Sequence, residues 1–197
     1  MAYTTPDVER ARATWLSAWL CGVLLMTGTT CVVMAQKPAT NTGDAPGVLP
    51  SGLGDAVDHD VTRVRAATEQ FKSTTAAEAA GYKRVTDCVE YQPAGAMGYH
   101  FQNNALLDTN LDVEHPEVLV YERMPDGTFK LNGVEFLVPI SAWTAAEPPK
   151  VMGQSLKRAE RLGIWYLHVW TWEPSPSGLF SDWNPRVKCD AGAAMQH

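Results

Sequence analysis

The sequence has no long run of Lys or Arg residues, which restricts the classes of partner that the chain is expected to bind. Its 16 Lys and Arg residues are outnumbered by 22 Asp and Glu residues, which gives a formal net charge of −6. Nucleic-acid binding requires a basic face that neutralises phosphate groups. The composition therefore argues against DNA or RNA as a partner.

The motifs of several large enzyme classes are also missing. The chain contains no Gly-x-Ser-x-Gly elbow, no P-loop and no His-Glu-x-x-His pair. These motifs supply the nucleophile of many hydrolases, the phosphate cradle of nucleotide-binding proteins and the zinc ligands of metalloproteases. The sequence thus gives no support to the hydrolase or nucleotide-binding classes.

Charged residues are absent between Arg12 and Lys37. Residues 15–26 form an apolar core within this stretch, and Val33-Met34-Ala35 provides a small-x-small pattern after it. This order is typical of a secretory signal. We therefore predict a signal peptide over residues 1–35 and export to the periplasm or the exterior. The alternative is an uncleaved transmembrane anchor, which is the one route to a membrane that we expect.

Cysteine is scarce, and two of the four cysteines, Cys21 and Cys31, lie in the predicted signal segment. Its removal would leave Cys88 and Cys189. Two cysteines in an exported chain most simply pair, so we predict a disulfide. Closing a loop of about a hundred residues contributes about 4 to 5 kcal/mol in the chain-entropy model. A metal or redox site of two free thiols is the alternative, and the distance between the cysteines in the sequence disfavours it.

The rest of the chain divides into a linker and one globular domain. Residues 36–54 are rich in Pro, Gly, Thr and Ala, which is typical of a flexible linker, and residues 55–197 follow as a single domain. A helix is predicted over residues 55–73, and a second, with a capping box at residues 75–78, ends at Gly81. Five residues of the first predicted helix recur at alternating steps of four and three and so lie on one stripe, namely Val57, Val61, Val64, Thr68 and Phe71.

From residue 82 onward the pattern changes to strands and turns. The strongest signal is a hairpin of residues 118–123 and 128–138, joined by Pro125-Asp126-Gly127, with a bulge or kink at Asn132-Gly133. A strand is also predicted over residues 164–172, and a short basic helix over residues 154–162. Helices first and antiparallel strands after predict an α+β fold. We expect N-terminal helices packed on an antiparallel, curved sheet or a partly closed β-barrel.

Two of the five histidines lie inside apolar strands. Aromatic residues flank His100, and strict alternation would place His168 on one face with Tyr166, Trp170 and Trp172. Glu135 lies in a strand that is apolar on both faces, where a carboxylate must be paired, protonated or bound to a metal.

Two histidines and one carboxylate from different strands suit a divalent metal such as zinc, iron or manganese. We therefore predict His100, Glu135 and His168 as metal ligands. The residues expected to shape the pocket around them are Tyr99, Tyr121, Tyr166 and Trp170. The alternatives are a buried hydrogen-bond network without metal and an acid–base pair for proton transfer.

A second candidate metal site is the acidic loop 108–114, which has a carboxylate or amide at every second position. This spacing resembles the opening of a calcium loop. Val113 stands where an EF-hand requires Gly, so the default interpretation is a solvated acidic loop.

Six sequence blocks form a recognisable set. They are AGY at 80–82, GAMGYHF at 95–101, PEVLVYE at 116–122, LNGVEFLVP at 131–139, LHVWTW at 167–172 and NPRVKC at 184–189. As a set, which covers most of the chain after Asp58, they resemble a family of uncharacterised exported bacterial proteins. The resemblance implies that the blocks around His100, Glu135 and His168 recur in the family, and it implies no activity. Val151-Met152-Gly153 departs from the Leu-Phe-Gly expected in that family.

On these grounds we expect an exported domain that binds a small molecule or a metal ion in a His/Glu pocket. A metal-dependent enzyme on the same three residues is the second hypothesis, and it requires an open coordination position. A structural or interaction module is the third, in which the polar core groups only specify the fold.

Overall fold

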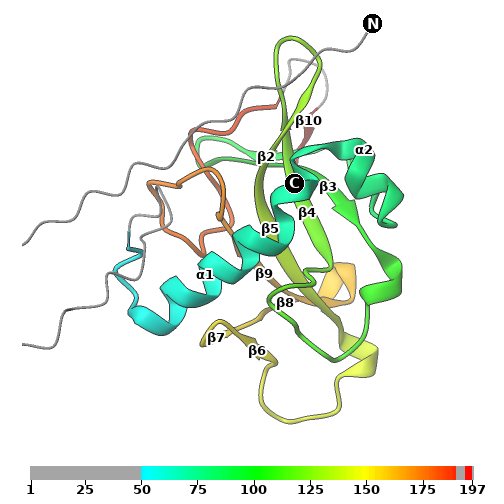
Figure 1. The fold of residues 1–197 in the computed structure, drawn as a ribbon. Helices are drawn as coiled ribbons and strands as arrows, with labels where there is room; N and C mark the ends of the chain where they lie inside the picture. Colours follow the sequence, from blue (N-terminus) through cyan, green and yellow to red (C-terminus); the bar gives the residue numbers. More distant parts are fainter. Residues whose placement is uncertain (1–49, 190–193, 197) are drawn as a thin grey trace, which may run out of the picture. The chain divides into compact units, whose positions relative to one another are not determined.

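The computed structural model describes residues 50–189 and 194–196. The predicted signal segment and most of the predicted linker lie outside the described residues. The described chain begins with helices α1 (Asp55–Thr68) and α2 (Thr74–Ala79), joined by the 3₁₀ turn η1 (Glu69–Lys72), and continues into a β-rich region (Figure 1). The fold is α+β, as predicted.

The stripe predicted for the first helix is buried. Val57, Val61 and Val64 on α1 are at most 7% exposed, and Thr68 and Phe71 continue the stripe. The predicted helix over 55–73 changes to a 3₁₀ turn at Glu69, where the Thr68 hydroxyl donates to the carbonyl of Val64. The prediction of a capping box at 75–78 was wrong, because the N-cap of α2 is Ser73, whose hydroxyl accepts from the backbone N–H of Ala76.

Seven strands form one continuous order in the main sheet. Their order is β10 (Ala194–Gln196), β2 (Cys88–Tyr91), β3 (Gly95–Gln102), β4 (Val118–Arg123), β5 (Phe129–Pro139), β9 (Ile164–Val169) and β8 (Lys157–Ala159). A further short strand, β1 (Lys83–Arg84), also pairs with β3. All neighbours are antiparallel except β10 and β2. In the described residues the end strands β10 and β8 do not pair with each other, so the sheet is not closed into a barrel.

The predicted hairpin is the pair β4 and β5. Met124 and Thr128 are hydrogen-bonded across the turn, and Gly127 adopts φ +85°, a left-handed conformation that favours glycine. Val120 pairs with Gly133 whereas Tyr121 pairs with Leu131, so Asn132 is the extra residue of a bulge. Both the hairpin and the bulge are therefore confirmed.

The predicted basic helix over residues 154–162 is wrong. This segment contains β7 (Gln154–Ser155), which pairs with β6 (Lys150–Val151), then β8 and the 3₁₀ turn η4 (Glu160–Leu162). Residues 157–159 pair with β9 from Tyr166 to Ile164. The exposed edge of β9 thus supplies hydrogen-bond partners that override the local helical pattern.

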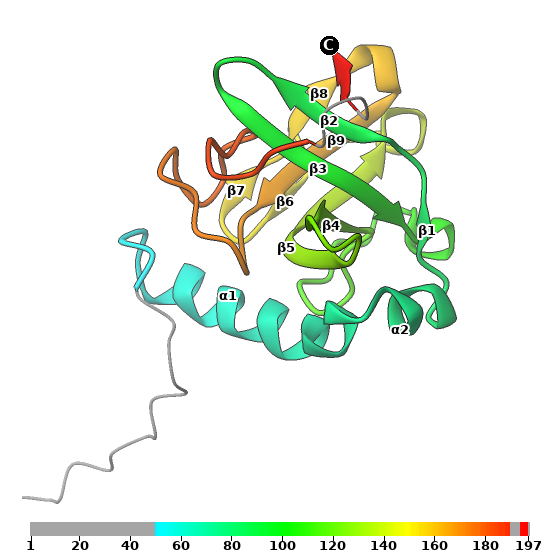
Figure 2. The same ribbon diagram turned by 90° about the horizontal axis from the view of Figure 1, so that it is seen from above.

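The two faces of the sheet have different roles, because successive strand residues point to opposite sides. Helices α1 and α2 lie along one face (Figure 2), and their apolar stripe joins the main core with Leu119, Phe136 and Leu167 from that face. Val118, Val120 and Leu137 lie on the other face with Tyr166. The candidate site is on this second face, which the helices do not cover.

None of the helices in the described part of the chain is both long enough and apolar enough to cross a membrane.

Candidate metal centre

Strands β3, β5 and β9 of the main sheet bring His100, Glu135 and His168 together. Glu135 on β5 pairs directly with His168 on β9. His100 on β3 pairs with Val120 of β4, which in turn pairs with Gly133, two residues before Glu135. All three side chains point to the face opposite the helices. One ligand atom from each lies within 4.8 Å of the other two.

The contacts among these residues are longer than hydrogen bonds. His100 Nε2 is 3.7 Å from Glu135 Oε2, and His168 Nδ1 is 4.0 Å from Glu135 Oε1. Hydrogen bonds to carboxylates have donor–acceptor distances of about 2.7 to 3.2 Å. The cluster therefore leaves space between its nitrogen and oxygen atoms.

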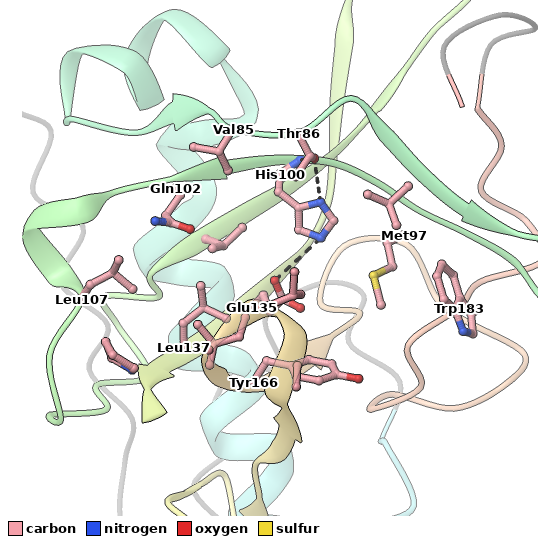
Figure 3. A pocket seen from close by; sticks show the side chains of 17 residues that line it. Val85, Thr86, Met97, His100, Gln102, Leu107, Glu135, Leu137, Tyr166 and Trp183 are labelled. Carbon is pink, nitrogen blue, oxygen red and sulfur yellow. Dashed lines mark hydrogen bonds and ion pairs between the residues drawn. The ribbon is translucent and has the colours of Figure 1, made fainter. Parts of the chain in front are cut away.

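Thr86 contacts the His100 ring at Nδ1, the nitrogen that does not face Glu135. Its Oγ1 is 3.1 Å from His100 Nδ1 and accepts the backbone N–H of His100 at 3.1 Å. Figure 3 shows the ring between Thr86 and Glu135. When Nδ1–H donates to Thr86, Nε2 presents its lone pair toward Glu135, the tautomer that a metal ligand requires.

His168 is the most enclosed member of the cluster. It is 0% exposed, and neither ring nitrogen has a hydrogen-bond partner among the described residues. The ring of Trp170 packs against it at a centroid distance of 4.3 Å. Buried polar atoms without partners are rare in folded proteins and ask for an explanation. An ion bound at Nδ1 satisfies one of these two nitrogens.

Burial sets the protonation of the cluster. It raises the pKa of Glu135 to about 8, with the negative charge of Asp182 adding to the shift and Lys157 opposing it. It lowers the pKa of His168 well below the ordinary value, and the nearby His100 and Lys157 act in the same direction. His168 is therefore neutral at pH 7, the form that binds metals.

A cavity of about 740 Å³ adjoins the cluster. His100 and Glu135 form part of its wall with Thr86, Gln102 and Tyr166, and most of the other lining side chains are apolar (Figure 3). The volume is within the range of small-molecule sites. One side of the cluster thus faces a space that admits a ligand, and His168 closes the opposite side.

Of the four aromatic residues expected to shape the pocket, only Tyr166 lines this cavity. Tyr99 packs edge-on against Phe129 in the main core, and the Tyr121 hydroxyl donates to the carbonyl of Phe71 at 2.6 Å. Tyr99 immediately precedes His100 on β3, so the two side chains necessarily point to opposite faces. The bulge at Asn132 alters the pairing of Tyr121 but keeps its side chain on the helix side.

Trp170 does not line the cavity either, because strand β9 ends at Val169. Its indole N–H donates to the carbonyl of Ser181, and its ring covers His168 from outside the strand. The chain then turns, with the Thr171 N–H donating to Val169. Trp172 consequently packs beside α1, where its indole donates to Thr68. The expectation that Trp172 shares a face with His168 was therefore wrong.

The structure adds cavity residues that sequence analysis did not single out. Thr86, Met97 and Trp183 line the cavity from segments far apart in the sequence. None of them has a distinctive sequence pattern. A second buried carboxyl was also missed: Glu117 is 1% exposed, accepts the N–H of Leu137 at 3.0 Å, and has a pKa raised by burial to about 8.

The acidic loop 108–114 does not assemble a comparable cluster. Asp112 contacts His115, and Glu114 contacts Arg63 on α1. Asp108 and Asp112 accept backbone N–H groups two residues ahead, as in ordinary turns. Within the described residues, His100, Glu135 and His168 are the one group of three or more such side chains placed to share an ion.

Cys88 and Cys189 lie at disulfide-bonding distance, with their Cα atoms 5.6 Å apart. The pairing predicted from the sequence is therefore confirmed. It attaches the irregular segment after β9 to strand β2, and the same segment places Trp183 against Tyr91 and on the cavity wall. A cysteine pair of this kind is typical of an oxidising environment.

Comparison of the chain with protein-family models, with curated proteins and with solved structures finds no match.

Proposed function

We propose that this chain is an exported domain that binds a divalent metal ion through His100, Glu135 and His168, beside a cavity for a small molecule. The observation that carries the proposal is the buried Nδ1 of His168. It has no hydrogen-bond partner among the described residues and points at a carboxylate that a second histidine approaches from the other side. This donor set suits zinc, iron or manganese.

The distances favour an ion over a metal-free polar network. Ligand atoms at about 2.1 Å from one tetrahedral ion lie about 3.4 Å from each other. The three ligand atoms are within 4.8 Å of one another, so small side-chain rotations bring them to that spacing. A network without an ion needs direct hydrogen bonds, which the separations of 3.7 and 4.0 Å do not provide.

A metal-dependent enzyme is the second candidate, and the position of the cavity favours it. Catalytic zinc sites have three protein ligands and keep one position open for water or substrate. His100 and Glu135 both border the cavity, so an ion held by them would have an open side there. Turnover of a substrate is the observation that separates an enzyme from a binding protein.

Export rests on two independent features. One is the order of charged, apolar and small residues over residues 1–35, which is typical of a secretory signal. The other is the Cys88–Cys189 pair, since such pairs persist mainly in oxidising compartments. The resemblance to exported bacterial proteins points in the same direction.

Metal analysis tests the proposal directly. The chain is purified from an oxidising compartment without a His-tag, and its metal content is measured by elemental analysis before and after titration with zinc, iron and manganese. We expect about one equivalent of metal per chain. Protein that remains metal-free after titration with all three would overturn the proposal.

The variants Glu135→Gln and His168→Ala assign the ion to the site, and His59→Ala is the matched control because His59 is exposed on α1. We expect metal in the control and none in the other two. Glu135→Gln is the decisive variant, since it keeps the size of the side chain and does not open a cavity in the core. Full metal content in Glu135→Gln would contradict the assignment of the ligands.

A further inference from the structure

We infer that the cavity binds a small, mainly apolar molecule with one metal-coordinating group at its end. The coordinating end rests on the proposed metal site, whereas the apolar body rests on the cavity alone. The inference comes from three observations: how polar groups are distributed over the wall, what surrounds the opening, and which charges are near.

Three polar side chains of the wall lie together, whereas two others, Gln102 and Tyr166, already donate hydrogen bonds to Asn104 and Asp182. His100, Glu135 and Thr86 lie together at the metal cluster (Figure 3). Much of the remaining wall is apolar and comes from five strands and one turn. Its members include Val89, Met97, Leu107, Val118, Leu137 and Ile164. A ligand that fills this space therefore has one polar end and an apolar body, because burying further polar groups against aliphatic side chains would cost free energy.

Exposed apolar side chains surround the cavity. Four large hydrophobic side chains are exposed in the described part of the chain, and two of them, Val85 at 51% and Leu162 at 68%, line the cavity. A third, Tyr91, stacks on the lining residue Trp183 at 5.7 Å. Exposed apolar residues gathered in one place mark a binding surface more often than chance exposure does. Here they form an apolar approach to the cavity.

The charges nearby disfavour a sugar phosphate or another highly charged ligand. His100 and Glu135 are the only lining residues of ionisable type besides Tyr166. Lys157, which acts electrostatically on Glu135, is already paired with Asp182 and also donates to the carbonyl of Phe180. The wall thus offers no Lys or Arg side chain to neutralise a phosphate, and a neutral or singly charged end group fits best.

A matched series of three probes tests the inference by calorimetry on the zinc-loaded chain. Octanohydroxamate has an apolar body and a zinc-binding end, acetohydroxamate has only the zinc-binding end, and octanamide has only the apolar body. We expect octanohydroxamate to bind at least tenfold more tightly than either of the others. Equal affinity for octanohydroxamate and acetohydroxamate would overturn the apolar cavity while the metal site stands.

Failure of the metal site would give a different set of results in the same measurements. If the chain takes up no zinc, iron or manganese, and octanohydroxamate and octanamide bind with equal affinity, the coordinating end and the proposed function are both overturned, and the apolar part of the inference is supported.

A variant of an exposed lining residue tests whether octanohydroxamate binds in this cavity. Leu162→Asp changes an exposed side chain, so the fold is retained, and Leu53→Asp is the control because Leu53 is 52% exposed and does not line the cavity. We expect Leu162→Asp to weaken octanohydroxamate binding about fivefold or more, with zinc content and acetohydroxamate affinity unchanged. Equal effects of the two variants on octanohydroxamate would contradict binding in this cavity.

Discussion

Glu135 and His168 face each other across the β5–β9 ladder, with Oε1 of the carboxyl group 4.0 Å from Nδ1 of the ring. Direct partners on adjacent antiparallel strands have their Cβ atoms about 5 Å apart, which keeps the two side chains at a fixed spacing. Backbone pairing, rather than a flexible loop, therefore positions two of the three proposed ligands. A site built in this way loses little conformational freedom when it binds an ion.

Thr86→Val tests the support behind His100. The change removes the hydroxyl that contacts His100 Nδ1 and the backbone N–H of the same residue, at nearly constant volume. Removing such an outer partner typically costs about 10- to 100-fold in metal affinity. We expect zinc affinity, measured by competition with a chelator, to fall by at least tenfold, while the chain still binds one equivalent at saturation.

The control for this prediction is Thr75→Val, an exposed threonine on α2. An unchanged zinc affinity in Thr86→Val would show that His100 is oriented without the hydroxyl.

Glu117→Gln tests the pH dependence of stability. The folded-state pKa of Glu117, raised to about 8 by burial, lies above the ordinary value of 4.5. The folded chain therefore holds a proton that the unfolded chain has released, and this contribution to stability is lost as the pH rises through 8. For the metal-free protein, the free energy of unfolding should fall between pH 6.5 and 8, by at most about 1.4 kcal/mol per pH unit for each such carboxyl group.

Glu135, with its similar pKa, contributes in the same direction, whereas the lowered pKa of His168 acts only below about 6.5. Glu117→Gln should therefore make the pH dependence shallower without abolishing it, as measured by urea unfolding at several pH values. The exposed Glu78→Gln variant is the control. A slope identical to that of the unmodified chain would mean that Glu117 titrates normally in the folded state.

Gly98→Ala tests the close approach of β3 and β4. Gly98 has φ +114°, and an added Cβ would clash with the backbone carbonyl oxygen of Tyr121. Gly178 is a matched control, since it has φ +110° but nothing within 4 Å of the added atom. Both variants suffer the backbone strain, which costs about 1 to 3 kcal/mol.

Only Gly98→Ala also pushes two paired strands apart, two residues before His100. We expect it to lower the free energy of unfolding by at least about 2 kcal/mol more than Gly178→Ala does. Chemical denaturation of the two variants measures this difference, and equal losses would show that strain alone accounts for the effect.

Sequence patterns predicted best where one local signal decides the structure. The α1 stripe follows from helical periodicity alone, and the β4–β5 hairpin follows from its turn residues. The buried carboxylate Glu135 stood out because its strand is apolar on both sides. Glu135 lies close to His100 and His168 because of the order of the strands in the sheet. This order cannot be predicted from the periodicity of the sequence.

The predictions that failed depended on where strands end and on what lies beside them. Trp172 leaves the face of His168 because β9 stops at Val169, and residues 157–159 become a strand because β9 presents an edge to them. Tyr99 was expected in the pocket because it neighbours His100 in the sequence, although neighbours on a strand face opposite sides. Thr86 was not found because its contacts with His100 are made between segments that are apart in the sequence.

The cysteine pair also determines how the chain responds to tension. Cys88 and Cys189 are 101 residues apart, and His100, Glu135 and His168 all lie between them. A force that pulls on the two ends of the oxidised chain would pass through the sulfur bridge and bypass the strands that carry these residues. Helices α1 and α2 and strands β1 and β10 lie outside the bridge and would bear the load first. Tension applied to the N-terminal segment would therefore not be transmitted along the strands that carry the candidate site.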